Sequence, residues 1–326
     1  MHRTIPTVND IRNAHGRIKD LIHRTPVITS KTVDSLVGKN VYFKCENFQK
    51  TGSFKVRGAL NGILSKLETS STIKGCVTHS SGNHGQALAW AAKHSDIECV
   101  VVIPKGTPEV KIQAIKAYNG RVEICEPSPK ARVDTCERIS RDESKVIVPP
   151  YDDYDVISGQ GTIALEFLEQ VPQLDAILVP SSGGGMISGI AIYAKSIKPS
   201  IRVFAVVPEG KNLEESLVAN QRLWGSESKF LNTKADAIRL QQCGDLTFPI
   251  MCELVEKDVF IQSDEKMIEA TKFAFERLKI VVELASGASI GAALSEKMKT
   301  NYPNLKHIGV VVCGGNIDIN HLPWVE

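Results

Sequence analysis

The chain has 326 residues, of which 42% are hydrophobic and 23% are charged, and its formal net charge is +2 at pH 7. This length can bury the core of one large domain or two modest ones, and the balanced charge gives no reason to expect a nucleic acid or a membrane surface as a partner. The eight scattered cysteines form no CxxC pair and no apolar run approaches the ~20 residues of a membrane span, so we expect reduced thiols and a cytoplasmic protein.

Hydrophobic spacing predicts an amphipathic opening helix over Val8–Leu21. The chain then alternates between strand-like and helical patterns, which predicts an α/β fold with twisted parallel sheets flanked by helices. The expected strands span residues 41–45, 75–78, 98–103, 121–124, 146–148, 176–180, 203–207 and 308–312. The expected helices span residues 54–67, 85–93, 108–118, 131–141, 159–168, 186–197 and 265–278.

The two successive series of strands indicate two domains. We expect a small domain at 72–150, inserted into a large domain made of 1–71 and 151–326. The segment 211–244 has weak periodicity and is expected to be irregular. In open parallel sheets, ligands bind beyond the carboxyl ends of the strands, where loops lead into helices. The motifs described next all lie in such places.

The segment Gln49–Leu60, QKTGSFKVRGAL, places Lys55 at the start of a predicted helix and next to Phe54. Lysines usually lie on solvated faces, and an exposed lysine at a helix start is one interpretation. The apolar neighbours Phe54 and Val56 would instead partly desolvate the ammonium group. Desolvation lowers the pKa of a lysine, and an amine with a lowered pKa can form a Schiff base. Three later glycine-rich stretches favour this second interpretation.

The segment Thr78–Gln86, THSSGNHGQ, follows a predicted strand and precedes a helix. Its small residues allow several backbone N–H groups to converge on a ligand at the helix start. The loop could therefore hold a substrate carboxylate, and Asn83 could donate to a phenolate-like oxygen. The alternative is a plain turn between a strand and a helix.

The segment Pro180–Gly189, PSSGGGMISG, also connects a strand to a helix. Three successive glycines after two serines favour a phosphate-binding loop at a helix N-terminus. The segment is neither a P-loop nor the dinucleotide-binding GxGxxG motif with a downstream acid, so an ATPase or a dehydrogenase is a weak interpretation.

The sequence allows two interpretations for each of two residues near the C-terminus. Cys313, in VVCGGN at the end of the last strand, either points into the ligand crevice or is a buried small hydrophobic residue. Glu283 precedes Gly287–Gly291, which we interpret as another loop leading into a helix. Glu283 is either a solvated acid or a neighbour of a cofactor.

The order of these motifs resembles that of fold-type II pyridoxal-phosphate enzymes: a lysine in SFKVRGA, then SGNHG, then the glycine-rich loop, then CGGN. The resemblance covers nearly the whole chain. Within that group, the sequence is most similar to serine racemases and serine/threonine dehydratases, through FKCENFQKTGSFKVRGALN, THSSGNHGQAL and SGQGTIALE. It implies a tryptophan synthase β-like architecture, with a large cofactor-binding domain and a small mobile domain.

The resemblance also implies a role for each motif residue. Lys55 would carry pyridoxal 5'-phosphate covalently and act as the base on one face of the substrate Cα. The other cofactor-binding residues would be Phe54 against the ring, Asn83 at the ring hydroxyl, Ser182, Gly183, Gly184, Gly185 and Met186 around the phosphate, and Cys313 at the pyridine nitrogen. The substrate-binding residues would be Ser80, Ser81, Gly82, Asn83, His84 and Arg132, of which Arg132 would help the small domain to close.

The implied activity is that of an amino-acid racemase and ammonia-lyase, which interconverts L- and D-serine and eliminates serine to pyruvate and ammonia. A neutral Cys313 would weaken the electron sink and disfavour transamination. Racemisation needs an acid opposite Lys55, and Ser81 stands where racemase relatives carry serine and many dehydratases carry alanine. One alternative is an L-serine/L-threonine or hydroxyaspartate dehydratase with little racemisation. Another is a weakly active or regulatory paralogue.

The sequence departs from the family pattern at a metal site. Relatives often bind Mg²⁺ or Ca²⁺ through acidic residues after the strand that ends here at Val207. In this chain Val207 stands at the first place, and Lys211, Asn212 and Leu213 stand near the second. A valine and a lysine supply no oxygen ligand, and the nearby Glu209, Glu214 and Glu215 are out of register, so we predict that no metal binds at this site.

Other departures concern the substrate and effectors. Ala237 replaces a glycine beside the cofactor, and Leu240 replaces a substrate-contacting serine. These two changes leave the identity of the substrate open. Tyr151–Asp153 differs from the nucleotide-contacting segment of racemases that bind ATP, so activation by ATP is also left open. Since relatives are commonly dimers, we expect a homodimer that acts on a small amino acid.

Overall fold

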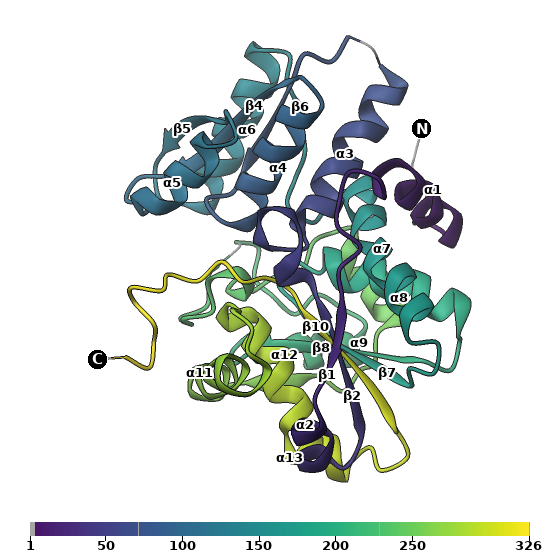
Figure 1. Cartoon of the computed structure of the whole chain (residues 1–326). Helices are drawn as coiled ribbons and strands as arrows, with labels where there is room; N and C mark the ends of the chain where they lie inside the picture. Colours follow the sequence, from purple (N-terminus) through teal and green to yellow (C-terminus); the bar gives the residue numbers. More distant parts are fainter. Residues whose placement is uncertain (1–3, 71, 228, 326) are drawn as a thin grey trace.

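The computed structural model describes residues 4–70, 72–227 and 229–325. Its strands form one sheet of six strands and one of four, and helices cover both sheets (Figure 1). All neighbouring strands are parallel except one pair at an edge. The predicted α/β fold with two parallel sheets is therefore confirmed.

The six-stranded sheet has the order β1-β2-β10-β7-β8-β9, and β1 pairs with β2 in the antiparallel direction. Its strands are β1 Val27–Thr29, β2 Asn40–Cys45, β7 Ala176–Pro180, β8 Arg202–Pro208, β9 Phe260–Gln262 and β10 His307–Val312. The helices around it are α1 Val8–Ile18, α2 Lys31–Val37, α7 Tyr154–Gln170, α8 Gly185–Ile197, α9 Leu213–Ala219, α10 Thr247–Leu254, α11 Asp264–Phe273, α12 Leu284–Leu294 and α13 Glu296–Thr300. Helices α7 and α8 lie on one face of the sheet, and α11 and α12 lie on the other (Figure 1).

The four-stranded sheet has the order β5-β4-β3-β6 and is parallel throughout. Its strands are β3 Gly75–His79, β4 Glu98–Pro104, β5 Arg121–Cys125 and β6 Val146–Ile147. The helices around it are α3 Lys55–Thr69, α4 Asn83–His94, α5 Glu109–Lys116 and α6 Pro129–Asp142. Apolar side chains on both faces of β4, with Val100, Val101 and Val102 almost completely buried, explain its continuous hydrophobic run.

Some sequence predictions were wrong in their details. The segment 211–244 contains helix α9 and a 3₁₀ turn, Asp236–Ile238, so it is only partly irregular. The residues Gly287–Gly291 lie inside α12 rather than in a loop, and the helix begins directly after its N-cap, Glu283. Helix α12 is buried on almost all sides, so its sequence has no polar face to reveal a helical period.

Two further features of the sequence can be compared with the structure. In the described part of the chain, no helix has the length and apolar character needed to cross a membrane. The eight cysteines all carry free thiols, as the sequence indicated. The domain boundaries at 72–150, and at 1–71 with 151–326, remain a prediction.

A buried cluster of ion pairs connects the first turn of α3 to the large sheet. The Arg57 side chain is completely buried, and its Nε and Nη2 donate to the Glu46 carboxylate at 2.7 and 2.8 Å. Its Nη1 and Nη2 donate to the Glu166 carboxylate of α7 at 2.7 and 2.9 Å. Lys44 of β2 donates to Glu166 at 2.6 Å, so two cations balance two carboxylates. Both arginine contacts are bidentate, the strongest geometry for such pairs.

This cluster anchors the first turn of α3. It joins α3 to β2, to the turn after β2 and to α7. Gly58 brings α3 close to α7, because a Cβ at this position would lie 2.8 Å from the Val156 carbonyl oxygen. Since Lys55 is the first residue of the same helix, its backbone position is fixed by these contacts.

We predict that Arg57→Met lowers the free energy of unfolding by about 3–5 kcal/mol, because it leaves two buried carboxylates with only one lysine. Urea unfolding followed by circular dichroism measures the change. Arg24→Met is the control, because its ion pair with Glu169 is about half exposed and should contribute at most about 1 kcal/mol. Equal losses in the two variants would contradict the prediction.

Candidate active site

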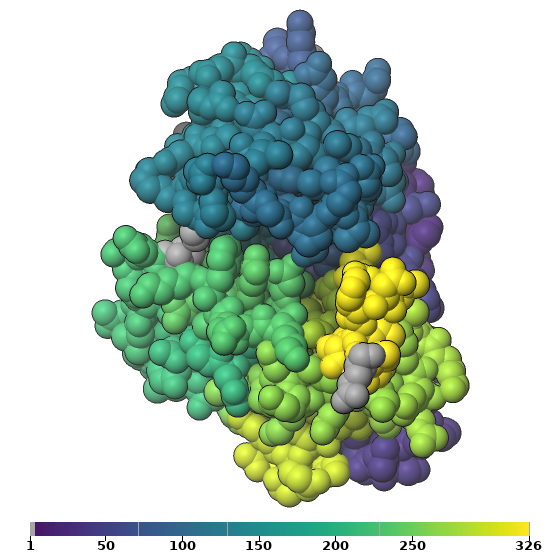
Figure 2. All heavy atoms as spheres, turned by 90° about the vertical axis from the view of Figure 1, so that its left-hand side faces the viewer, coloured from purple at the N-terminus to yellow at the C-terminus, as the bar shows by residue number. Residues whose placement is uncertain are grey.

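A cavity of about 1300 Å³ lies between the two sheets. Figure 2 shows the seam between the unit that carries the small sheet and the rest of the molecule, with the C-terminal segment beside it. The cavity brings together every site residue predicted from the sequence. These residues are Phe54, Lys55, Ser80, Ser81, Gly82, Asn83, His84, Arg132, Ser182, Gly183, Gly184, Gly185, Met186 and Cys313.

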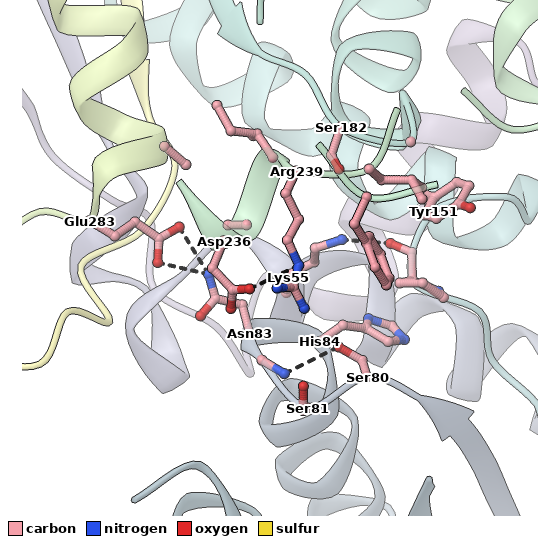
Figure 3. Close-up of a pocket in the computed structure, with 18 of the residues that line it drawn as sticks. Lys55, Ser80, Ser81, Asn83, His84, Tyr151, Ser182, Asp236, Arg239 and Glu283 are labelled. Carbon is pink, nitrogen blue, oxygen red and sulfur yellow. Dashed lines mark hydrogen bonds and ion pairs between the residues drawn. The ribbon is translucent and has the colours of Figure 1, made fainter. Parts of the chain in front are cut away.

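Lys55 projects from the start of α3 into this cavity (Figure 3). Its Nζ donates to the Pro150 carbonyl oxygen at 2.7 Å and lies 5.1 Å from the centre of the Phe54 ring. Burial lowers the pKa of Lys55 to about 8, against a smaller raising effect of Cys313 and Glu283. At neutral pH roughly a tenth of the molecules therefore carry a free amine here, far more than for an ordinary lysine. The interpretation as an exposed lysine was wrong.

The glycine-rich loop leads from β7 into α8. Gly184 has φ +95°, a backbone conformation that favours glycine, and it is the N-cap of α8 without a side-chain hydrogen bond. A Cβ at Gly183 would lie 2.4 Å from the Tyr151 ring, so this position also requires glycine. The first N–H groups of a helix have no acceptor within the helix, and they attract anions. The loop is therefore suited to a phosphate group.

The loop between β3 and α4 forms a second wall. Gly82 is the N-cap of α4, again without a side-chain hydrogen bond, so this helix also presents free N–H groups. His84 is buried and its Nε2 lies 3.0 Å from the Val148 carbonyl oxygen. Burial and the nearby Lys55 lower the pKa of His84 to about 3, which makes it a neutral imidazole. This wall can bind a carboxylate through backbone groups and the hydroxyls of Ser80 and Ser81.

Glu283 and Cys313 lie together at the far end of the cavity. The Asn83 side chain donates to both Glu283 oxygens at 3.0 Å, and Glu283 is only 7% exposed, so its interpretation as a solvated acid was wrong. Burial raises the pKa of Glu283 to about 7. The Cys313 thiol donates to Glu283 at 3.8 Å, and burial raises its pKa strongly, so it stays neutral.

Sequence reasoning missed two basic residues, Lys111 and Arg239, that lie on the cavity wall with the predicted Arg132. Lys111 of α5 pairs with Asp236 at 2.6 Å, and Arg239 pairs with the same carboxylate at 3.1 Å. The guanidinium carbons of Arg132 and Arg239 lie 5.2 and 4.6 Å from the centre of the Phe230 ring. The buried Nε of Arg132 has no hydrogen-bond partner among the described residues. We call Lys111, Arg132 and Arg239 the cationic wall.

Tyr151, Asp152 and Asp153 also have defined partners. Tyr151 packs on the glycine-rich loop, and burial raises the pKa of its hydroxyl. The Asp152 carboxylate accepts hydrogen bonds from the backbone N–H groups of residues 245–247. Asp153 caps α7 and pairs with Lys66. No local motif marks the first two of these contacts, because both partners lie far along the chain.

Comparisons with known proteins agree with this geometry. The family model described as pyridoxal-phosphate dependent enzyme matches residues 18–314. A serine racemase from Arabidopsis thaliana is 44% identical over 315 residues, which cover 96% of this chain and 93% of that protein. The crystal structure of a pyridoxal 5'-phosphate-dependent aspartate racemase is 50% identical, with a TM-score of 0.97 and 100% of both chains covered. The structure of maize serine racemase is 41% identical, with a TM-score of 0.92 over 97% of this chain and 95% of that chain.

The raised pKa of Glu283 leads to a prediction about pH and stability. The folded protein keeps the proton up to about pH 7, whereas an unfolded chain releases it near pH 4.5. The free energy of unfolding therefore falls as the pH rises between these values, by up to about 3 kcal/mol. Glu283→Gln should remove this part of the pH dependence in the cofactor-free protein.

Urea unfolding of both proteins at about pH 5 and about pH 8 measures the difference. The exposed Glu253 provides the control substitution, Glu253→Gln, which should leave the pH dependence unchanged. If Glu283→Gln and wild type differ by the same free energy at both pH values, the carboxyl group titrates normally and the prediction is wrong.

Proposed function

Because the chain belongs to the family of pyridoxal-phosphate dependent enzymes that includes the serine racemases, we propose that it racemises a small α-amino acid. Serine is the expected substrate, and elimination to pyruvate and ammonia is the expected side reaction. The observation that carries this proposal is the convergence of Lys55, Ser81 and the start of α8 on one cavity.

The residues of the cavity fit the cofactor. The N–H groups at the start of α8 suit its phosphate, and the Ser181 hydroxyl before the loop is buried without a hydrogen-bond partner among the described residues. Lys55 would hold it covalently, while Phe54, Asn83 and Cys313 would surround its ring. When bound, pyridoxal phosphate supplies a conjugated system that stabilises negative charge at the substrate Cα.

Proton transfer would be the work of two side chains. Lys55 has a pKa of about 8, close enough to neutral pH for the amine to take a proton from Cα and to return it. Ser81 would exchange a proton on the opposite face of Cα, which inverts the configuration. The neutral Cys313 thiol cannot supply a positive charge at the ring nitrogen, and this favours a short-lived carbanion over transamination.

Two alternatives follow from the same site. In a dehydratase acting on serine, threonine or hydroxyaspartate, Lys55 would still take the proton from Cα, and Ser81 would take no part in proton transfer. In a regulatory paralogue, neither would act, although the retained lysine and glycine-rich loop argue against this. Because Tyr151, Asp152 and Asp153 all have partners within the chain, we do not expect ATP to bind through their side chains. A homodimer in the cytoplasm remains a prediction.

The Ser81→Ala substitution tests the proposal. We predict that it lowers D-serine formation by at least about 100-fold, because one face of Cα loses its acid, while pyruvate formation stays within a few-fold of wild type. Chiral chromatography and a pyruvate assay on the same sample measure both products. Lys55→Ala should lose both. Wild-type protein that makes pyruvate without any D-amino acid would reject the racemase and favour the dehydratase.

Aspartate is a second candidate substrate. A structure with 50% identity over the whole chain is that of an aspartate racemase. The cationic wall also supports a substrate with a second carboxylate, because Lys111 and Arg239 share the single carboxylate of Asp236 and Arg132 has a free buried Nε. A side-chain carboxylate would satisfy Arg132, whereas a serine hydroxyl would leave its charge unbalanced.

We predict that Arg132→Met raises the KM for aspartate about tenfold more than the KM for serine, because a charge-assisted hydrogen bond is lost only with the dicarboxylate. Steady-state racemisation of both amino acids measures the ratio. Arg138→Met, on the same helix and about half exposed, is the control. Equal effects of Arg132→Met on both substrates would exclude this role and leave serine as the proposed substrate.

A further inference from the structure

The loop after β8 contains a buried lysine that contacts main-chain oxygens. Lys211 is 1% exposed, and its Nζ donates to the carbonyl oxygens of Leu240 at 2.6 Å and Gln241 at 3.0 Å. Within residues 4–70, 72–227 and 229–325, the hydrogen-bond partners of this ammonium group are the two carbonyl oxygens and no carboxylate. Its own carbonyl oxygen accepts a hydrogen bond from the Trp224 indole at 2.7 Å, which holds the lysine backbone in place.

The two carbonyl groups belong to a short antiparallel ladder beside the cavity. The Leu231 N–H donates to the carbonyl oxygen of Arg239 at 2.7 Å, and the Gln241 N–H donates to the carbonyl oxygen of Lys229 at 3.1 Å. Phe230 and Leu240 face each other between these bonds. We call residues 229–231 and 239–241 the cavity ribbon. Phe230, Arg239 and Leu240 of this ribbon line the cavity, so its position determines the shape of one wall.

The residues around Lys211 do not fit the Mg²⁺ or Ca²⁺ that the family resemblance implies after this strand. Such ions need about six or more oxygen ligands. Val207, Lys211 and Leu213 are each 1% exposed, and their side chains offer no oxygen. Within the described residues, no group of three or more His, Cys, Asp or Glu side chains could hold a metal ion. The two carbonyl oxygens, a ligand type that Ca²⁺ accepts, are instead occupied by the lysine.

We propose that Lys211 is a built-in cation that fixes the cavity ribbon to the end of β8, in place of a divalent metal ion. The ammonium group is attached to the chain, so the ribbon keeps its position when divalent ions are removed. Lys211 is thus a positioning residue that acts on substrate binding through Arg239 and Leu240. Only this effect on substrate binding rests on the proposed function.

The first test compares two buried lysines in the holoenzyme. Lys39 is 8% exposed, and its Nζ also donates to two carbonyl oxygens, those of Tyr302 at 2.7 Å and Leu305 at 2.9 Å, away from the cavity. Lys39→Met and Lys211→Met should both lower the Tm. Only Lys211→Met should also raise the apparent Kd for L-serine, the expected substrate, by about tenfold. The titration is followed by the visible absorption of the bound cofactor.

The titration needs binding of the amino acid but no turnover, so it can still be read if the protein proves to be a dehydratase rather than a racemase. Equal Kd changes in the two variants would overturn the positioning role. The second test needs no variant: wild-type holoenzyme is treated with EDTA, then given MgCl₂ or CaCl₂. We expect the Tm and the Kd for the amino acid to stay unchanged. A rise in Tm or a fall in Kd on adding either ion would show that a divalent ion still acts here, and would overturn the proposal.

Discussion

The position of the candidate active site depends on the charge pairing of Arg57 inside the protein. Its guanidinium is held between Glu46 and Glu166 without contact to water, two residues after Lys55. Burying four charges is costly, and an apolar cluster of the same volume would stabilise a fold as well or better. The ion pairs instead orient helix α3. The two bidentate contacts constrain the orientation of α3, and in this orientation Lys55 lines the cavity.

The same cavity receives the N-termini of three helices, α3, α4 and α8, none of which has a side-chain hydrogen bond at its N-cap. Each helix start carries a partial positive charge. The cavity is therefore positive before any basic side chain is counted, and the cationic wall adds to it. Asp236 and Glu283 are among the acids that line the cavity and oppose this field. The pKa of Glu283 is raised to about 7 mainly by its burial. A small ligand with two or three anionic groups suits such a site.

Residues that follow a strand in a recognisable motif could be predicted from the sequence. Strand-to-helix connections bring four such features to the cavity: Lys55, Ser81, Asn83 and the glycine-rich loop. Two three-residue strands, β1 and β9, were missed because three residues show no period. Phe230 and Arg239 could not be placed either. They belong to a segment without regular periodicity, and its course depends on distant contacts such as those of Lys211 with Leu240 and Gln241.

The Asn83 side chain links three distant parts of the chain. Its nitrogen donates to Glu283, and its oxygen accepts a hydrogen bond from Asn316 at 2.8 Å. Glu283 sets the orientation of the Asn83 amide, because a flipped amide would place its oxygen against the Glu283 carboxylate. Asn316 begins the tail that runs beside the seam in Figure 2. A chain that stopped before Asn316 would deprive the Asn83 oxygen of this donor and leave Glu283 alone to hold the amide.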